Sequence, residues 1–318
     1  MKADLVDLNF SDLYLRLDKD GQAIYRIGPN NEGKSGLAAV PDGHDSDLAA
    51  VRNAINDDGT NSGTVTYDEM RLRFVRMPTV EDQVWAAIRR IPLSPPTLDE
   101  LGLHPDAVTM MRGFAARRGL VLIGGATGAG KTTTVFGALH DYLKIRGGVA
   151  ITLEDPPELL LQGPVGAGIC FQMGISETYT WQMAVMAALR SRPRYILIGE
   201  IRTPEAAQQA LIASQSGHLV LTTAHGGSVE EAVETIIGLA EVRLGEQAAR
   251  RLMAGNLLAA IHQWMGHYGP NLEVVQTKSG GTRAQDPVRS GIIDNRPDVL
   301  RQNLVKFTAP PPRAAAAE

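Results

Sequence analysis

The feature that most constrains this chain is a glycine-rich segment, Gly125-Ala126-Thr127-Gly128-Ala129-Gly130-Lys131-Thr132, which fills the pattern G-x-x-x-x-G-K-[ST]. An apolar segment, 119–123, precedes it, and a helical pattern over 132–145 follows it. A strand, a glycine loop and a helix in this order place backbone N–H groups and the positive end of a helix dipole around a polyphosphate. This context predicts that the chain binds a nucleoside triphosphate.

The residue types within this loop predict separate roles. Lys131 is expected to reach the β- and γ-phosphates, and the hydroxyl of Thr132 is expected to ligate Mg²⁺. The predicted nucleotide-binding residues are Gly125, Ala126, Thr127, Gly128, Ala129, Gly130, Lys131, Thr132 and Thr133.

A second segment, Gly28-Pro29-Asn30-Asn31-Glu32-Gly33-Lys34-Ser35, fits the same pattern. The Ala23–Ile27 segment before it can form a strand, but the residues after it, 36–43, are too short and too broken by Gly and Pro for a phosphate-facing helix. Without that helix the loop lacks the dipole and the anchored donors. We therefore expect a solvated hairpin loop here.

Composition places the chain among ordinary globular proteins. It has 318 residues, of which 44% are hydrophobic and 21% charged, and its net charge of −4 gives no overall attraction to nucleic acid or to anionic membranes. Its single cysteine, Cys170, is expected to be a small core residue in a reducing compartment. The start of the chain lacks the basic and apolar regions of a signal peptide, and no apolar run approaches a membrane span, so we expect a cytoplasmic protein.

The patterning predicts two domains and a tail. Residues 1–91 show alternating apolar residues at 13, 15 and 17 and at 72 and 74, with a helix over 42–57, and predict a small α+β domain. Pro-rich residues 92–98 predict a linker. Residues 99–267 predict an α/β domain, and residues 268–318, rich in Gly, Pro and Arg, are expected to be loosely structured.

In the larger domain apolar strands alternate with helical stretches, which indicates a parallel sheet covered by helices. The expected strands are 120–123, 149–153, 195–198 and 219–222. The expected helices are 132–145, 180–190, 204–214, 229–240 and 245–265.

Reactive side chains accompany three of these strands. Glu154 follows the second strand, Glu200 follows the third, and His218 and His225 flank the fourth. Ligands of an open parallel sheet bind beyond the carboxyl ends of its strands. Phosphoryl transfer to water needs charge neutralisation, Mg²⁺ and a group that orients the attacking water, so these carboxylates and imidazoles are candidates for that chemistry. Thr132, Glu154 and Glu200 are the candidate Mg²⁺ ligands, partly through water.

Four motifs in this order resemble the secretion-superfamily ATPases of type II secretion, type IV pili and type IV secretion. They are the phosphate loop, the acidic box Glu154-Asp155-Pro156, the Walker B motif ending Gly199-Glu200-Ile201-Arg202, and the histidine box from Gly217 to His225. The resemblance implies a RecA-like P-loop domain with a small α+β, PAS-like N-terminal domain. It also implies that Glu200 activates water, that Glu154 supports Mg²⁺, and that His218 and His225 respond to the γ-phosphate.

Two N-terminal segments resemble those that supply arginine fingers to a neighbouring subunit in this family: Arg71-Leu72-Arg73-Phe74 and Arg89-Arg90-Ile91-Pro92. We expect Arg73 and Arg90 to act in this way. The resemblance implies a homohexamer with ATP and Mg²⁺, working with inner-membrane components of a secretion, conjugation or pilus machine. Recruitment to the inner membrane would then come from these partners.

Departures from the family pattern favour one branch. The chain has Pro193-Arg194 where the motors usually read Pro-Asp, and Arg202-Thr203 where they read Arg-Asp. The segment Ala260-Ile261-His262-Gln263-Trp264-Met265 stands where they carry Gln-Arg. The chain also lacks the C-terminal Ala-Ile-Arg-Glu-Gly signature of the pilus retraction motors. Together these differences point to the DotB/TraJ-like ATPases of type IVB secretion and conjugation. A nucleotide-gated assembly subunit with little turnover and a monomeric P-loop kinase remain the alternatives.

Overall fold

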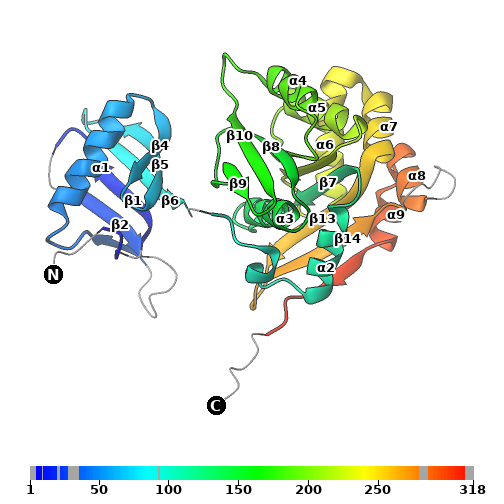
Figure 1. Ribbon diagram of the computed structural model, residues 1–318, viewed down its shortest axis with the longest axis horizontal. Helices are drawn as coiled ribbons and strands as arrows, with labels where there is room; N and C mark the ends of the chain where they lie inside the picture. Colours follow the sequence, from blue (N-terminus) through cyan, green and yellow to red (C-terminus); the bar gives the residue numbers. More distant parts are fainter. Residues whose placement is uncertain are drawn as a thin grey trace. The chain divides into compact units, whose positions relative to one another are not determined.

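The chain divides into two compact units in the computed structural model (Figure 1). The smaller unit contains residues 1–94 and 158–160, and the larger contains residues 95–157 and 161–318. The structure describes residues 5–8, 10–19, 22–27, 36–91, 94–278 and 286–311. The second glycine-rich segment, 28–35, lies outside the described residues.

The smaller unit is an antiparallel sheet with strand order β3-β2-β1-β6-β5-β4. Its strands are β1 (Phe10–Arg16), β2 (Ala23–Ile27), β3 (Leu37–Ala39), β4 (Ser62–Tyr67), β5 (Met70–Pro78) and β6 (Val84–Ile91). Leu13 and Leu15 of β1 and Leu72 and Phe74 of β5 are fully buried in one core with helix α1 (Asp45–Asp58). The alternation seen in the sequence therefore reflects a sheet with one face covered.

The larger unit is built on a sheet with strand order β15-β14-β13-β7-β12-β11-β8-β10-β9. The six strands from β13 to β10 in this order are parallel, and β9, β14 and β15 pair antiparallel at the two edges. The strands are β7 (Gly119–Gly124), β8 (Gly148–Glu154), β9 (Gly163–Val165), β10 (Gly168–Gly174), β11 (Tyr195–Glu200), β12 (Leu219–Ala224), β13 (Leu257–Met265), β14 (Pro270–Gln276) and β15 (Val305–Phe307).

Helices cover both faces of this sheet (Figure 1). The helices are η1 (Leu98–Leu101), α2 (Pro105–Phe114), α3 (Lys131–Arg146), α4 (Trp181–Arg190), α5 (Pro204–Gln215), α6 (Val229–Leu244), α7 (Glu246–Asn256), α8 (Pro287–Ile293) and α9 (Pro297–Gln302). Side chains of α4 to α9 form one buried cluster with the central strands, whereas α2 and η1 pack on α3. The α/β fold predicted from alternating strands and helices is confirmed. No helix within the described ranges has both the length and the apolar character needed to cross a membrane.

The helix expected over 245–265 is wrong in its second half. Helix α7 ends at Asn256, and β13 begins at Leu257 between β7 and β14. Leu257 to Ile261 are all buried. A short apolar run that is buried on both faces lacks the alternation of polar and apolar residues that separates strands from helices. A central strand and a buried helix therefore have the same sequence pattern.

The expectation of a loosely structured tail after residue 268 is also wrong for most of the described residues there. Strands β14 and β15 extend the large sheet, and α8 and α9 pack through Val288, Ile292 and Leu300. The prolines that suggested disorder open these elements: Pro270 starts β14, and Pro287 and Pro297 stand at the first positions of α8 and α9. A proline at these positions gives up no ladder or helix hydrogen bond.

Candidate nucleotide-binding site

The glycine-rich loop 125–130 joins the buried strand β7 to helix α3. Gly130 is the N-cap of α3 and has φ +80°, in the left-handed region that glycine adopts without a steric penalty. At Gly125 a Cβ would lie 2.4 Å from the carbonyl oxygen of Gln263 on β13. The loop therefore depends on glycine both for its turn and for its close approach to the neighbouring strand.

Lys131, the first residue of α3, points back across this loop. Its Nζ donates to the carbonyl oxygens of Gly125 at 2.9 Å and Ala126 at 3.0 Å. The side chain is 7% exposed. The ammonium is thus held over the loop, beside the backbone N–H groups at the start of α3, which is the arrangement that binds phosphate oxygens.

Glu200, at the end of β11, brings a carboxylate to the same place. Its Oε1 lies 3.8 Å from Nζ of Lys131 and 3.1 Å from Nε2 of His225, and Arg202 pairs with its other oxygen. The ladder between β11 and β12 shifts register between Ile198 and Glu200, which turns this strand end away from regular pairing. Lys131 at the start of α3, Arg202 after β11 and His225 after β12 therefore meet at the carboxylate of Glu200.

Glu154, the last residue of β8, is 3% exposed and held by neutral donors. Its Oε1 accepts hydrogen bonds from Oγ1 of Thr152 at 2.6 Å and from Nε2 of Gln172 at 2.9 Å. Burial raises the pKa of the Cys170 thiol, on the neighbouring strand β10, to about 12, and the charge of Glu154 adds to that shift. Cys170 is a buried core residue, as predicted.

The donor set suits Mg²⁺. The hydroxyl of Thr132 lies in the first turn of α3, and the carboxylates of Glu154 and Glu200 stand at neighbouring strand ends, with Gly199 next to Glu154 across the β8–β11 pair. Hydroxyl and carboxylate oxygens, completed by water and phosphate, are the ligands that Mg²⁺ takes in nucleotide sites. The residues present therefore fit the ion.

His218 does not belong to this cluster. It precedes β12, whereas His225 follows it, so the two imidazoles stand at opposite edges of the sheet, roughly 20 Å apart along the strand. Burial, with the nearby Arg118 guanidinium, lowers the pKa of His218. Its interpretation as a γ-phosphate sensor beside the phosphate loop is wrong, because the histidine box spans a whole strand and only its far end reaches the site.

A comparison with known protein families shows the family to which this chain belongs. Residues 45–262, more than half of the chain, match the family described as Type II/IV secretion system protein. The chain belongs to this family. The resemblance drawn from the four motifs is thereby confirmed.

Curated relatives agree. The chain is 34% identical over 178 residues to the Uncharacterized protein YggR of Escherichia coli K12, with 56% of this chain and 53% of that protein covered. It is 34% identical over 154 residues to the Type IV pilus ATPase PilU of Pseudomonas aeruginosa, with 48% and 39% covered. The chain thus spans about half the length, or less, of these two relatives.

Two solved structures share the fold of this chain. The Legionella pneumophila ATPase DotB gives a TM-score of 0.69 at 20% identity, covering 94% of this chain and 86% of that one. The pilus retraction motor PilT with bound ADP gives 0.68 at 24% identity, covering 93% and 85%. The DotB-like branch is consistent with these matches, which at such identities show the fold alone.

The two arginines expected to act on the nucleotide of a neighbouring subunit lie in the smaller unit. Arg73 on β5 is opposite Arg89 on β6, and Arg90 is opposite Leu72. NH1 of Arg90 donates to the carbonyl oxygen of Val6 at 3.1 Å. Their action on a nucleotide remains a prediction.

Sequence reasoning missed two glutamines that support the site. Gln172 on β10 donates to Glu154 and accepts the backbone N–H of Leu161 through its Oε1. Gln263 on β13 is fully buried and donates from Nε2 to the carbonyl oxygen of Ala129 at 2.6 Å. Both lie on strands that the sequence analysis did not recognise, so no pattern placed them at the carboxyl edge.

Proposed function

We propose that this chain is a Mg-dependent ATPase that works as a homohexameric motor of a type IV secretion, conjugative transfer or type IV pilus apparatus. The observation that carries the proposal is the Glu200 carboxylate, held 3.8 Å from the Lys131 ammonium and 3.1 Å from the His225 imidazole beside the phosphate loop. Family membership supports the same conclusion, as do relatives named as pilus and type II secretion proteins.

In the proposed reaction the loop backbone and Lys131 bind the β- and γ-phosphates of ATP. Glu200 orients a water molecule for attack on the γ-phosphorus and accepts its proton, while His225 holds the carboxylate from the other side. Thr132, with Glu154 and Glu200 through water, would hold Mg²⁺, which would supply charge neutralisation for the phosphate oxygens. The bond that breaks is the one between the γ-phosphorus and the β,γ-bridging oxygen, and ADP and phosphate leave.

Arg73 and Arg90 extend this proposal to the assembly. An arginine that approaches the γ-phosphate of a neighbouring subunit stabilises charge in the transition state and makes hydrolysis depend on the position of that neighbour. The work of the ring would then pass to inner-membrane components of the machine.

The deciding experiment is Glu200→Gln. We expect this variant to bind ATP normally, because Lys131 and the loop are intact, and to lose about 10²- to 10⁴-fold in turnover, because the amide cannot accept the proton. ATP binding is measured by fluorescence titration and turnover by phosphate release, with the exposed Glu241→Gln on α6 as the matched control.

Normal turnover in Glu200→Gln would remove the catalytic assignment. Negligible turnover in the unmodified chain would favour the nucleotide-gated assembly subunit. Phosphate release should also rise per subunit as light scattering shows hexamers forming. Steady release by a monomer would remove the motor and bring the kinase alternative forward.

A further inference from the structure

The edge of the large sheet opposite the phosphate loop is rich in cationic side chains. The parallel strands β7, β12, β11 and β8 all begin at this edge. Basic residues cluster in the segments that lead into three of these strands, β7, β11 and β8. They are Arg117, Arg118, Lys144, Arg146, Arg190, Arg192 and Arg194, which we call the amino-edge belt.

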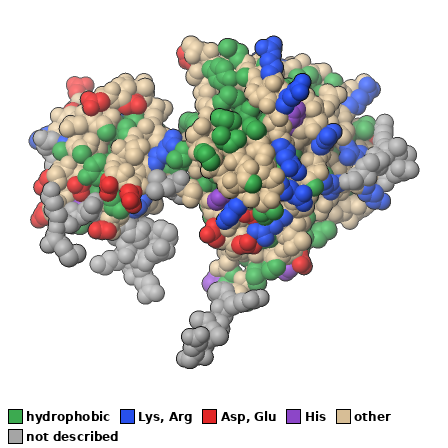
Figure 2. All heavy atoms as spheres, viewed as in Figure 1, with side chains coloured by type: hydrophobic (Ala, Val, Ile, Leu, Met, Phe, Trp, Pro, Cys, Tyr) green, Lys and Arg blue, Asp and Glu red, His purple; other side chains and the backbone are tan. Residues whose placement is uncertain are grey.

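No acidic residue interrupts the belt. Segments 115–118, 144–148, 190–194 and 215–218 contain no Asp or Glu, although the chain as a whole has a net charge of −4. Apart from half-buried Arg117, every member of the belt is exposed. Figure 2 shows Lys and Arg side chains gathered on the visible face of the larger unit, where Asp and Glu are few.

Three arginines of the belt have no counter-charge among the described residues. Among the residues that the structure describes, Arg118 and Arg192 form neither an ion pair nor a side-chain hydrogen bond. Arg194 donates to the carbonyl oxygen of Arg146 at 3.3 Å and stacks over the Tyr195 ring, which fixes its position and leaves its charge uncompensated. Unpaired like charges held together repel one another, so the belt costs stability unless an anion meets it.

The segments that carry the amino-edge belt lie next to one another along the edge of the sheet. Strand order places the segments before β7, β12, β11 and β8 side by side. Three strand spacings of about 4.8 Å give a track of about 14 Å. An extended peptide spans that distance with about four or five residues.

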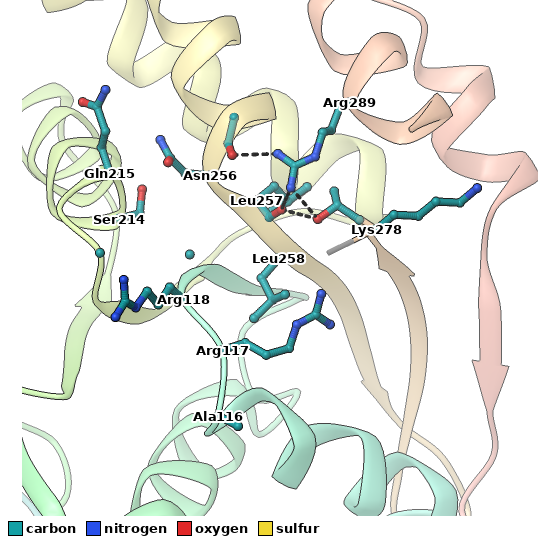
Figure 3. Close-up of a pocket in the computed structure, with 14 residues that line it drawn as sticks. Ala116, Arg117, Arg118, Ser214, Gln215, Asn256, Leu257, Leu258, Lys278 and Arg289 are labelled. Carbon is teal, nitrogen blue, oxygen red and sulfur yellow. Dashed lines mark hydrogen bonds between the residues drawn. The ribbon is translucent and has the colours of Figure 1, made fainter. Parts of the chain in front are cut away.

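A pocket of about 440 Å³ lies at the β7 end of this track. Arg117, Arg118, Ser214 and Asn256 line it, and the two guanidinium groups reach toward opposite sides of the opening (Figure 3). Arg289 on its far wall donates to the carbonyl oxygen of Gly255 at 2.7 Å and stabilises the end of α7. No Asp or Glu is among the residues that line the pocket.

We propose that the amino-edge belt binds an extended acidic segment of a partner protein, with one carboxylate seated in the pocket beside the Arg118 guanidinium. The linear track matches a peptide backbone, and the pocket offers a discrete seat for a single anionic group. Guanidinium groups bind carboxylates with two parallel hydrogen bonds, which suits a site made mainly of arginine.

Other polyanions fit these observations less well. Binding of single-stranded nucleic acid relies on aromatic platforms for base stacking, and the belt segments contain no Phe, Trp or Tyr. Membrane surfaces are bound by a broad basic face with inserted large apolar or aromatic side chains, whereas Ile145 is the one exposed large apolar residue in the belt segments.

The test uses the full chain and a fluorescein-labelled peptide of about twelve residues in which Glu and Ser alternate. We expect salt-sensitive binding by fluorescence anisotropy, and none by the same peptide with Gln in place of Glu. The double variant Arg118→Glu, Arg192→Glu should weaken peptide binding by about tenfold or more and leave ATP hydrolysis unchanged. Neither side chain supports the fold, and circular dichroism checks this.

The matched control is Arg251→Glu, an exposed charge reversal on α7 outside the belt, which should leave peptide binding unchanged. Equal peptide binding by the double variant overturns the proposal. The proposal is also overturned if the peptide does not bind, whereas phosphatidylglycerol vesicles or an oligothymidine strand bind the unmodified chain and not the double variant. A change in mass by light scattering on charge reversal would instead identify the belt as a contact between copies of this chain.

Discussion

The two edges of the large sheet carry opposite arrangements of charge. At the carboxyl edge, Glu200 meets Lys131, His225 and Arg202, and Glu154 is buried and hydrogen-bonded. At the amino edge, most side chains of the belt are exposed, and within the described part of the chain Arg118 and Arg192 form no ion pair. Compensated charges in a confined space hold fixed positions, which a reaction needs, whereas uncompensated charges at the surface attract a partner from solution.

The two histidines of one strand test this difference most strongly. His225→Ala should lower turnover by about 10²-fold, because it removes a group 3.1 Å from the Glu200 carboxylate. His218→Ala, at the other end of β12, should change turnover by less than about twofold. Phosphate release at saturating ATP measures both. Equal losses in the two variants would contradict the separation of the edges.

A smaller effect is expected from Gln172, which positions Glu154. Gln172→Leu removes the amide donor to the Glu154 carboxylate and should lower turnover by about 10- to 100-fold. The concentration of Mg²⁺ needed for half-maximal turnover should rise, while ATP affinity stays close to normal.

Gln182→Leu, an exposed change on α4, is the control for general effects of an added leucine. An unchanged Mg²⁺ requirement in Gln172→Leu would show that Glu154 is positioned without this amide.

The smallest effect concerns the thiol between the two edges. Burial and the charge of Glu154 raise the pKa of Cys170 to about 12, so at pH 8 the folded chain should resist iodoacetamide and the unfolded chain should react. Glu154→Gln removes the negative charge and lowers the thiol pKa, which should increase the slow reaction of the folded chain at pH 9. Mass spectrometry follows the modification, and an unchanged rate would argue against a charged Glu154.

Much of the carboxyl edge could be predicted from the sequence, because its local context was complete. A strand, a glycine loop and a helix follow one another around Lys131, and Glu154, Glu200 and His225 each follow an apolar run. The sequence also shows that His218 lies at the amino end of its strand. Its predicted place at the carboxyl edge is wrong because the histidine box spans the whole of β12.

The supporting residues could not be predicted, for a physical reason. Gln172 and Gln263 act across strand pairs whose partners are far apart in the sequence, and a hydrogen bond such as that from Gln263 to Ala129 spans 134 residues. Local periodicity carries no information on such pairs.

The bond from Gln263 to the phosphate loop also bears on the synthesis of the chain. When residue 132 has emerged from the ribosome, the loop sequence is complete, but the strand that fixes it does not yet exist. β13 must be translated and must insert beside β7 before Ala129 gains its donor and Gly125 its neighbour. A nascent or truncated chain that ends before Gln263 therefore carries the full glycine-rich motif without its fixed geometry, so nucleotide binding is expected only once the larger unit is nearly complete.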